Sequence, residues 1–250
     1  MAGHSKWANI KHRKAAQDKR RGKIWTRIIK EITVAARDGG GDEDGNPALR
    51  LAVQNAKGSN MPKDTIERAI KKGMGGEGAD LSLQVYEGYA PNGIALIIET
   101  FTDNINRTVA NIRSIFNKYG GSLGTNGSLS FIFDQKGVFI VQNLDSINKE
   151  SLELELIEGG AEEVEYSDNN IIITTSFEDF GLMQNKLDNL KLEMESAEIQ
   201  IIPNNTLVLN LEDSQRVLSI IDKFEEDEDV NQVYHNLELT EELQIALSAE

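Results

Sequence analysis

The sequence predicts an α+β protein: a helical N-terminal domain followed by two β-α-β-β-α-β domains, one inserted in the other. Three observations lead to this prediction. Apolar residues repeat at helical spacing from Ile24 to Ile70 and alternate at strand spacing in many later segments. The balance of charge changes near the same residue, and the β-α-β-β-α-β pattern then occurs twice. A chain of 250 residues has room for one to three domains.

The N-terminal third contains three predicted helices. Ile24 to Ala36 show helical spacing, and a run of three glycines at 39–41 ends that helix. Asn46-Pro47 is a cap followed by a first-turn proline, and it begins a second helix that ends at 58–62. The third helix ends at Lys71-Lys72-Gly73.

A glycine-rich segment, residues 73–80, follows the helices and is predicted to be a linker. Its Gly73-x-Gly75-x-x-Gly78 string matches a dinucleotide-binding fingerprint in letters alone. That fingerprint follows a strand, whereas this string follows a helix, so the linker interpretation is favoured.

The rest of the chain is predicted to form the two nested units, preceded by an alternating Leu83 and Val85. The inner unit consists of strand 137–142, helix 146–158, strand 162–166, strand 170–175, helix 177–190 and strand 197–202. The outer unit consists of strand 94–102, helix 105–119, strand 128–133, strand 206–211, helix 213–225 and strand 230–237. Each string is that of a ferredoxin-like domain, in which two helices cover one face of an antiparallel sheet. The expected domains are 1–78, 79–134 plus 204–250, and 135–203.

Composition excludes several classes of site. The chain has no cysteine, which excludes disulfides, thiol nucleophiles, zinc knuckles and iron–sulfur clusters. The sequence shows no phosphate-binding loop and no nucleophile elbow. The three histidines do not form a metal-ligand pair, and His235 fits a strand better than a metal site. We therefore expect no metal, no cofactor and no catalytic residue. No long apolar run or apolar opening segment occurs, which favours a cytoplasmic protein without membrane contact.

Charge is distributed very unevenly along the chain. Residues 1–30 hold ten Lys/Arg and one acid, whereas residues 79–250 hold nine Lys/Arg and 32 acids. The acidic run at 225–229 is expected to be a solvated surface that keeps the later domains away from phosphate. A basic segment in a chain of net charge −15 points to a polyanionic partner, namely nucleic acid.

The candidate nucleic-acid-binding residues lie in the first 72 residues. In residues 1–30, basic side chains that neutralise phosphate are interleaved with histidines and aromatic rings that can stack on bases. Residues 47–72 are predicted to be two helices joined by a short turn with Gly58, a shape compatible with a helix-turn-helix but a weak signal by itself. The predicted contacts are His4, Lys6, Trp7, Lys11, His12, Arg13, Lys14, Lys19, Arg20, Arg21, Lys23, Arg27, Lys63, Arg68, Lys71 and Lys72.

Two further assignments have an ordinary alternative. Trp25 lies on the apolar stripe of its helix, so a place in the core is favoured over contact with nucleic acid. Arg107, Asn111 and Lys118 share one stripe of helix 105–119, opposite its apolar face. This stripe is either an ordinary solvated face or a second contact with RNA or protein. Asp103 or Asn104 is expected to cap this helix.

The sequence also resembles a known family over nearly its whole length. Met1-Ala-Gly-His-Ser-Lys-Trp-Ala-Asn-Ile-Lys-His-Arg-Lys14 resembles the opening of the YebC/PmpR family. Further matching motifs are Asn60-Met-Pro-Lys-Asp64, Ile66-Glu-Arg-Ala-Ile-Lys-Lys-Gly73, Tyr86-Glu-Gly-Tyr89, Thr102-Asp-Asn104, Asn106-Arg-Thr108, Gly120-Gly-x-Leu-Gly124, Ile202-Pro-x-Asn205 and Val233-Tyr-His-Asn236.

The resemblance implies three domains, the last inserted in the second, and a role in gene expression. Family members are described as probable transcriptional regulators that bind DNA. They are also viewed as ribosome-associated translation factors, related to mitochondrial translational activators. The first hypothesis is therefore a non-enzymatic nucleic-acid-binding regulator. The second is an enzyme acting on nucleic acid, such as a metal-dependent nuclease, which the absence of paired acids near the basic segment disfavours.

Overall fold

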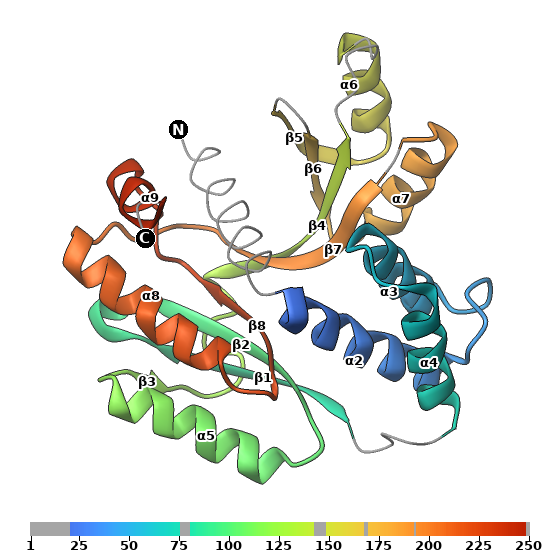
Figure 1. The fold of residues 1–250 in the computed structure, drawn as a ribbon. Helices are drawn as coiled ribbons and strands as arrows, with labels where there is room; N and C mark the ends of the chain where they lie inside the picture. Colours follow the sequence, from blue (N-terminus) through green and yellow to red (C-terminus); the bar gives the residue numbers. More distant parts are fainter. Residues whose placement is uncertain (1–20, 76–80, 143–148, 168–169, 193, 249–250) are drawn as a thin grey trace. The chain divides into compact units, whose positions relative to one another are not determined.

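The computed structural model describes residues 21–75, 81–142, 149–167, 170–192 and 194–248, with side chains from residue 24 onwards to residue 247. The chain divides into two compact units. Unit 1 holds the described parts of 1–23, 78–134 and 202–250, and unit 2 those of 24–77 and 135–201. Two four-stranded sheets and eight α-helices occur in the described ranges, which confirms the α+β class (Figure 1). The division into three domains stays a prediction.

The helical part of unit 2 consists of α2 (Arg21–Gly39), α3 (Pro47–Gly58) and α4 (Lys63–Met74). The predicted apolar stripes meet in one core, to which each helix contributes, for example Ile32, Leu49 and Ile66. All three helices were predicted, because each has a clear 3.6-residue period and a recognisable end.

Asn46 joins the first two helices. Its Oδ1 accepts a hydrogen bond from the Leu49 amide at 3.1 Å, which caps α3 as the sequence predicted. Its Nδ2 donates to the carbonyls of Ala35 and Gly40, each at 2.8 Å. Asn46 is buried, so one side chain satisfies backbone groups at the end of α2 and at the start of α3.

The inserted sheet of unit 2 follows the predicted order of elements. It contains β4 (Phe133–Gln142), α6 (Lys149–Glu158), β5 (Ala161–Tyr166), β6 (Asn170–Ser176), α7 (Phe180–Asn189) and β7 (Met194–Pro203). The strand order β5-β6-β4-β7 places the first and third strands in the centre, as a ferredoxin-like unit requires. Phe139, Ile173 and Leu156 belong to the core beneath α6 and α7.

Helix α3 covers the free edge of this sheet. Strand β7 is an edge strand, and the Ala197 amide on it donates to Asn55 Oδ1 at 3.1 Å. At Gly58 a Cβ would lie 1.9 Å from the Glu195 carbonyl oxygen, so only glycine allows this approach. Gln184 Nε2 donates to Gln54 Oε1 at 3.1 Å in the same contact. The helical part and the inserted sheet therefore pack as one unit.

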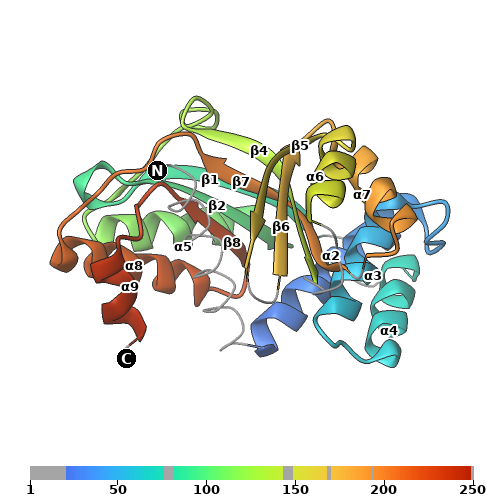
Figure 2. The same ribbon diagram turned by 90° about the horizontal axis from the view of Figure 1, so that it is seen from above.

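Unit 1 contains the second sheet, with the order β3-β1-β2-β8. Its elements are β1 (Ser82–Tyr89), the 3-10 turn η1 (Pro91–Gly93), β2 (Ala95–Thr102), α5 (Ile105–Lys118), β3 (Ser122–Leu123), α8 (Leu211–Glu225), β8 (Val230–His235) and α9 (Glu241–Ser248). Helices α5 and α8 lie side by side on one face of the sheet (Figure 2). Leu96, Phe116 and Phe224 are buried between the sheet and these helices.

Two of the strands predicted for this unit do not form. Residues 128–132 form turns that lead into β4 at Phe133. Segment 206–211 forms one isolated bridge, Leu207 to Leu237, before α8. The reason is that β1 fills the central place that the third strand of the pattern would take. The sheet keeps the predicted spatial layout, but one central strand comes from the start of the domain.

Candidate nucleic-acid interface

Helix α4 has one buried and one exposed face. Ile66, Ala69 and Gly73 are buried against the other two helices. The opposite face carries four predicted contacts, Lys63, Arg68, Lys71 and Lys72, all of them exposed. Two acids, Asp64 and Glu67, share this face, which leaves it a net charge of +2. We call these four cations the α4 basic face.

The four cations differ in how firmly they are held. Lys63 is 87% exposed, and its Nζ lies 3.7 Å from Glu67 Oε1, which makes a weak surface pair. Arg68 donates to the Asp64 carbonyl and to Thr65 Oγ1 on its own helix. Within the described part of the chain, Lys71 and Lys72 have no ion-pair partner. Both lysines are therefore available to an anion, and both also stabilise the carboxyl end of the helix.

The close crossing of α2 and α4 explains why residue 73 is a glycine. A Cβ there would lie 2.4 Å from the Thr33 carbonyl oxygen, so α4 approaches α2 more closely than a larger residue allows. The Thr33 hydroxyl lies at this crossing, 2.7 Å from the Ile29 carbonyl. Gly73 and Met74 therefore belong to α4, so the predicted start of the linker at residue 73 is wrong, and residues 76–80 lie outside the described residues.

Trp25 packs against the helical core, as predicted. Its Nε1 donates to the Ser59 carbonyl at 3.2 Å, in the turn between α3 and α4. Asn60 in the same turn has a left-handed backbone, φ 54°, and Pro62 is the N-cap of α4. The tryptophan therefore fixes the turn that sets the direction of α4.

Arg27 differs from the other predicted contacts. Its guanidinium lies 2.9 Å from Glu31 on the same helix and 3.4 Å from Glu198, and the side chain is 14% exposed. Two carboxylates of its own unit already neutralise this cation, so we leave Arg27 out of the proposed interface.

The remaining predicted contacts belong to the N-terminal segment. The positions His4, Lys6, Trp7, Lys11, His12, Arg13, Lys14, Lys19 and Arg20 lie outside the described residues. Arg21 and Lys23 are in α2, with side chains outside the described set. For residues 1–22, called the basic arm from here on, the assignment stays a prediction.

The stripe on α5 forms an internal network. Arg107 Nη2 lies 2.9 Å from both carboxylate oxygens of Asp229 and 2.8 Å from Asp103 Oδ1. These hydrogen bonds, led by that to Asp229, raise the pKa of Arg107. The hydroxyls of Thr108 and Thr102 also donate to Asp229 Oδ2, at 2.8 and 3.3 Å. Arg107 is therefore engaged by acids of its own unit, an arrangement that neither the solvated face nor the second contact had predicted.

The other two residues of the stripe are also engaged. Asn111 Nδ2 donates to Asp227 Oδ2 at 3.0 Å. Lys118 Nζ lies 5.5 Å from the centre of the Tyr119 ring, a cation–π contact. Asn104 caps α5 by accepting from the Arg107 amide, which decides between the two predicted caps.

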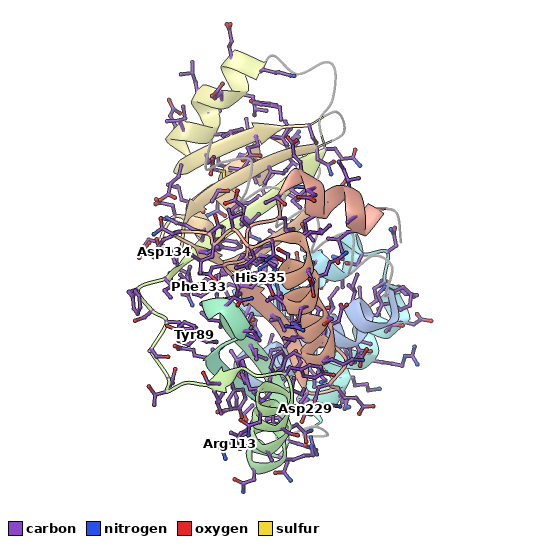
Figure 3. All side chains as sticks on the ribbon, turned by 90° about the vertical axis from the view of Figure 1, so that its left-hand side faces the viewer. Tyr89, Arg113, Phe133, Asp134, Asp229 and His235 are labelled. Atoms are coloured by element: carbon purple, nitrogen blue, oxygen red, sulfur yellow. The ribbon has the colours of Figure 1, made fainter. Side chains whose placement is uncertain are left out.

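The prediction that the acidic run at 225–229 is solvated is wrong for Asp229. The run 225–229 was expected to be solvated, yet Asp229 is buried, at 8% exposure. It begins the connection into β8, and Figure 3 labels it beside α5 and Arg113. The motif Thr102-Asp-Asn104 with Asn106-Arg-Thr108 supplies the donors for this carboxylate, and that motif was the available signal.

Three other expectations concern His235, a metal site and a membrane-spanning helix. His235 ends β8 and pairs with Leu96, so it is a strand residue as predicted. In the described ranges no group of three His, Asp or Glu is placed to hold a metal ion. Within the same ranges, no helix has the length and apolar character needed to cross a membrane.

Comparison with known proteins decides the family. The model of the N-terminal domain of TACO1/YebC proteins matches residues 5–76. The model of the second and third domains matches residues 81–237. The chain belongs to the TACO1/YebC family.

Individual TACO1/YebC relatives match over nearly their full length. A probable transcriptional regulatory protein of Amoebophilus asiaticus is 53% identical over 239 residues, which are 95% of this chain and 98% of that protein. The probable transcriptional regulatory protein YebC of Salmonella arizonae is 45% identical over 249 residues, covering 99% and 100%. The solved structure of the conserved hypothetical protein Aq1575 from Aquifex aeolicus is also similar. It has a TM-score of 0.77 and 40% identity, over 88% of this chain and 91% of that one.

Proposed function

We propose that this protein is a non-enzymatic, nucleic-acid-binding regulator of gene expression that works in the cytoplasm. The observation that carries the proposal is the α4 basic face, with Lys71 and Lys72 exposed and without an ion-pair partner in the described residues. The basic arm leads into the same helical part of the chain, while residues 79–250 carry a net charge of −23. Phosphate is therefore attracted to one end of the sequence and repelled by the rest.

Duplex DNA is the first target of the proposal. Helices α3 and α4 are joined by a four-residue turn, and α3 is covered on both sides, by the helical core and by β7. The second helix is left with its polar face exposed, as a helix that enters a groove must be. Relatives named probable transcriptional regulatory proteins support this choice.

Replacing Lys71 and Lys72 together by Ala tests the proposed DNA contact. The double variant should bind a fluorescein-labelled 30-base-pair duplex several-fold more weakly than the parent at about 100 mM salt, as measured by fluorescence anisotropy. A double variant that binds the duplex as tightly as the parent protein contradicts a role for the α4 basic face.

RNA is the second candidate, and the composition of the basic arm favours it. Aromatic and histidine side chains stack on unpaired bases, which folded RNA offers and duplex DNA hides. Trp7→Ala removes a ring without removing charge. We expect it to weaken binding to a single-stranded RNA or to ribosomes by about five- to a hundredfold, and binding to duplex DNA much less. Equal effects on both targets contradict the stacking role of Trp7.

The absence of catalysis is the third part of the proposal. The protein should leave labelled DNA and RNA intact over hours in the presence of Mg²⁺ or Mn²⁺. Cleavage that co-purifies with the protein, and that disappears in an acidic-residue variant, would establish the nuclease alternative instead.

A further inference from the structure

Phe131 is the most exposed large apolar side chain in the described part of the chain, at 73% exposure. It lies in the segment 124–132, which links β3 to β4 through consecutive turns. Single exposed apolar residues are common at protein surfaces. What distinguishes Phe131 is the way its loop is held.

A buried carboxylate holds this loop. Glu87 on β1 accepts hydrogen bonds from the amides of Gly127 at 2.7 Å and Leu129 at 2.6 Å. It also accepts from the Ser128 hydroxyl at 3.2 Å. Glu87 is 7% exposed and Leu129 is fully buried, so the loop is attached to the interior two residues before Phe131.

The two ends of the loop are fixed as well. At the start, the Gly124 amide donates to the Glu87 carbonyl at 2.7 Å. At the end, the Ile132 carbonyl accepts from the Asn204 amide at 2.8 Å. Figure 3 labels Tyr89, where β1 ends, together with Phe133 and Asp134, where the loop joins β4, along one side of unit 1. The loop therefore has one preferred conformation.

Two sequence motifs that the proposed function does not use explain this attachment. Tyr86-Glu-Gly-Tyr89 supplies Glu87, and it supplies Gly88, where a Cβ would lie 2.5 Å from the Ser122 carbonyl oxygen. Gly120-Gly-x-Leu-Gly124 supplies the tight turn and the Gly124 amide. Both motifs thus hold this loop in place although the Phe131 ring lies in water. An exposed ring contributes no burial free energy to the folded state of the free protein.

The charge around the loop favours a protein partner over nucleic acid. Two ranges of unit 1, 81–134 and 202–248, contain five Lys/Arg and fifteen Asp/Glu. Segment 122–134, which includes the loop, contains no Lys or Arg. A phosphate backbone would be repelled here, whereas a basic protein surface would be attracted.

We propose that the 124–132 loop docks a basic partner protein by inserting Phe131 into an apolar pocket. A rigid aromatic anchor loses little conformational entropy on binding and is a common energetic centre of protein interfaces. The excess of acids in residues 81–134 and 202–248 complements the basic rim of such a pocket. This inference goes beyond nucleic-acid binding and holds whichever nucleic acid the basic arm and the α4 basic face contact.

Site-specific crosslinking in cells tests the partner class. The full-length protein carries the photo-reactive p-benzoyl analogue of phenylalanine at position 131, or at position 245 as a control. Ile245 is also in unit 1 and is similarly exposed, at 71%. We expect position 131 to give a discrete adduct that protease removes and nuclease does not, with a partner that mass spectrometry shows to be basic.

Other crosslinking outcomes overturn the proposal. An adduct removed by nuclease would identify Phe131 as a nucleic-acid contact. An adduct with the mass of two copies of this chain would identify a self-association surface. An adduct that forms equally at position 245, or no adduct at 131, would show that the loop is not a docking site.

Binding of the purified partner completes the test. Phe131→Ser should raise Kd at least tenfold, whereas Phe131→Tyr, which keeps the ring, should stay within about threefold. Ile245→Ser should bind like the parent protein. Glu87→Gln, checked to be folded by circular dichroism, should weaken binding with Phe131 still present, because the loop loses its position. Unchanged binding by Phe131→Ser refutes the proposal.

Discussion

Helices α4 and α5 have similar sequence patterns, but their cationic side chains differ in whether acids of the protein bind them. Each is amphipathic, and each has cationic side chains opposite its apolar face. On α4 the two lysines of the last turn are exposed and without an ion-pair partner in the described residues. On α5 Arg107 is bound to Asp229, which lies 122 residues further along the chain. Helical periodicity therefore identifies the face, while availability depends on acids brought in by the tertiary fold.

The largest effect is expected from removing the acid that engages α5. Asp229→Ala should lower the free energy of unfolding of unit 1 by about 3 kcal/mol, because three side chains lose a buried carboxylate partner. Urea unfolding followed by circular dichroism measures this change. Asp103→Asn is the matched control, because it contacts the same arginine from an exposed position, at 59% exposure. Its effect should stay within about 0.5 kcal/mol. Equal effects of the two variants would contradict the buried network.

The comparison also depends on how α3 supports α4. Gly58→Ala should destabilise unit 2 by about 2 kcal/mol, because a Cβ there would lie 1.9 Å from the Glu195 carbonyl oxygen on β7. Gly45→Ala is the matched control, because its nearest contact would be an ordinary 3.7 Å from Asp42. Thermal unfolding of the two variants measures the difference. Similar melting temperatures for both would show that α3 does not pack on the edge of β7.

A smaller effect distinguishes the two helices in binding. Lys71→Ala with Lys72→Ala should make the log–log salt dependence of duplex binding shallower by about 1.8, since each phosphate contact contributes about 0.9. Arg113→Ala with Lys118→Ala removes two exposed cations from α5 and should leave the slope unchanged. If the α5 pair changes the slope and the α4 pair does not, the interface lies on α5.

Much of the fold follows from periodicity in the sequence. The helical part and the inserted sheet were predicted element by element, because their apolar patterns match the local structure. Segment 128–133 also alternates, yet the Leu129 amide donates to the Glu87 side chain and forms no strand ladder. A periodicity argument does not detect side-chain acceptors that are far away in the sequence. In addition, β1 occupies the central position in the sheet of unit 1 that the third strand of the predicted pattern would take.

The candidate site was predictable where it depends on residues that are close together in the sequence. The sequence identified the α4 basic face and the core position of Trp25, because both depend on neighbours within one or two helices. It did not identify the partner of Arg27, since Glu198 lies 171 residues away. It also assigned Asp229 to a solvated run, because five consecutive acids resemble an exposed segment.

Deleting the basic arm tests the central claim most directly. Residues 1–22 hold seven Lys/Arg, and the apolar-periodic helix begins at Ile24, so residues 23–250 should remain folded by circular dichroism. The measurement is the binding constant for duplex DNA and for RNA against salt concentration, for the full-length and the shortened protein. The account predicts a loss of affinity of at least a hundredfold and a much shallower salt dependence in the shortened protein. A folded, shortened protein with full affinity and an unchanged slope would contradict it.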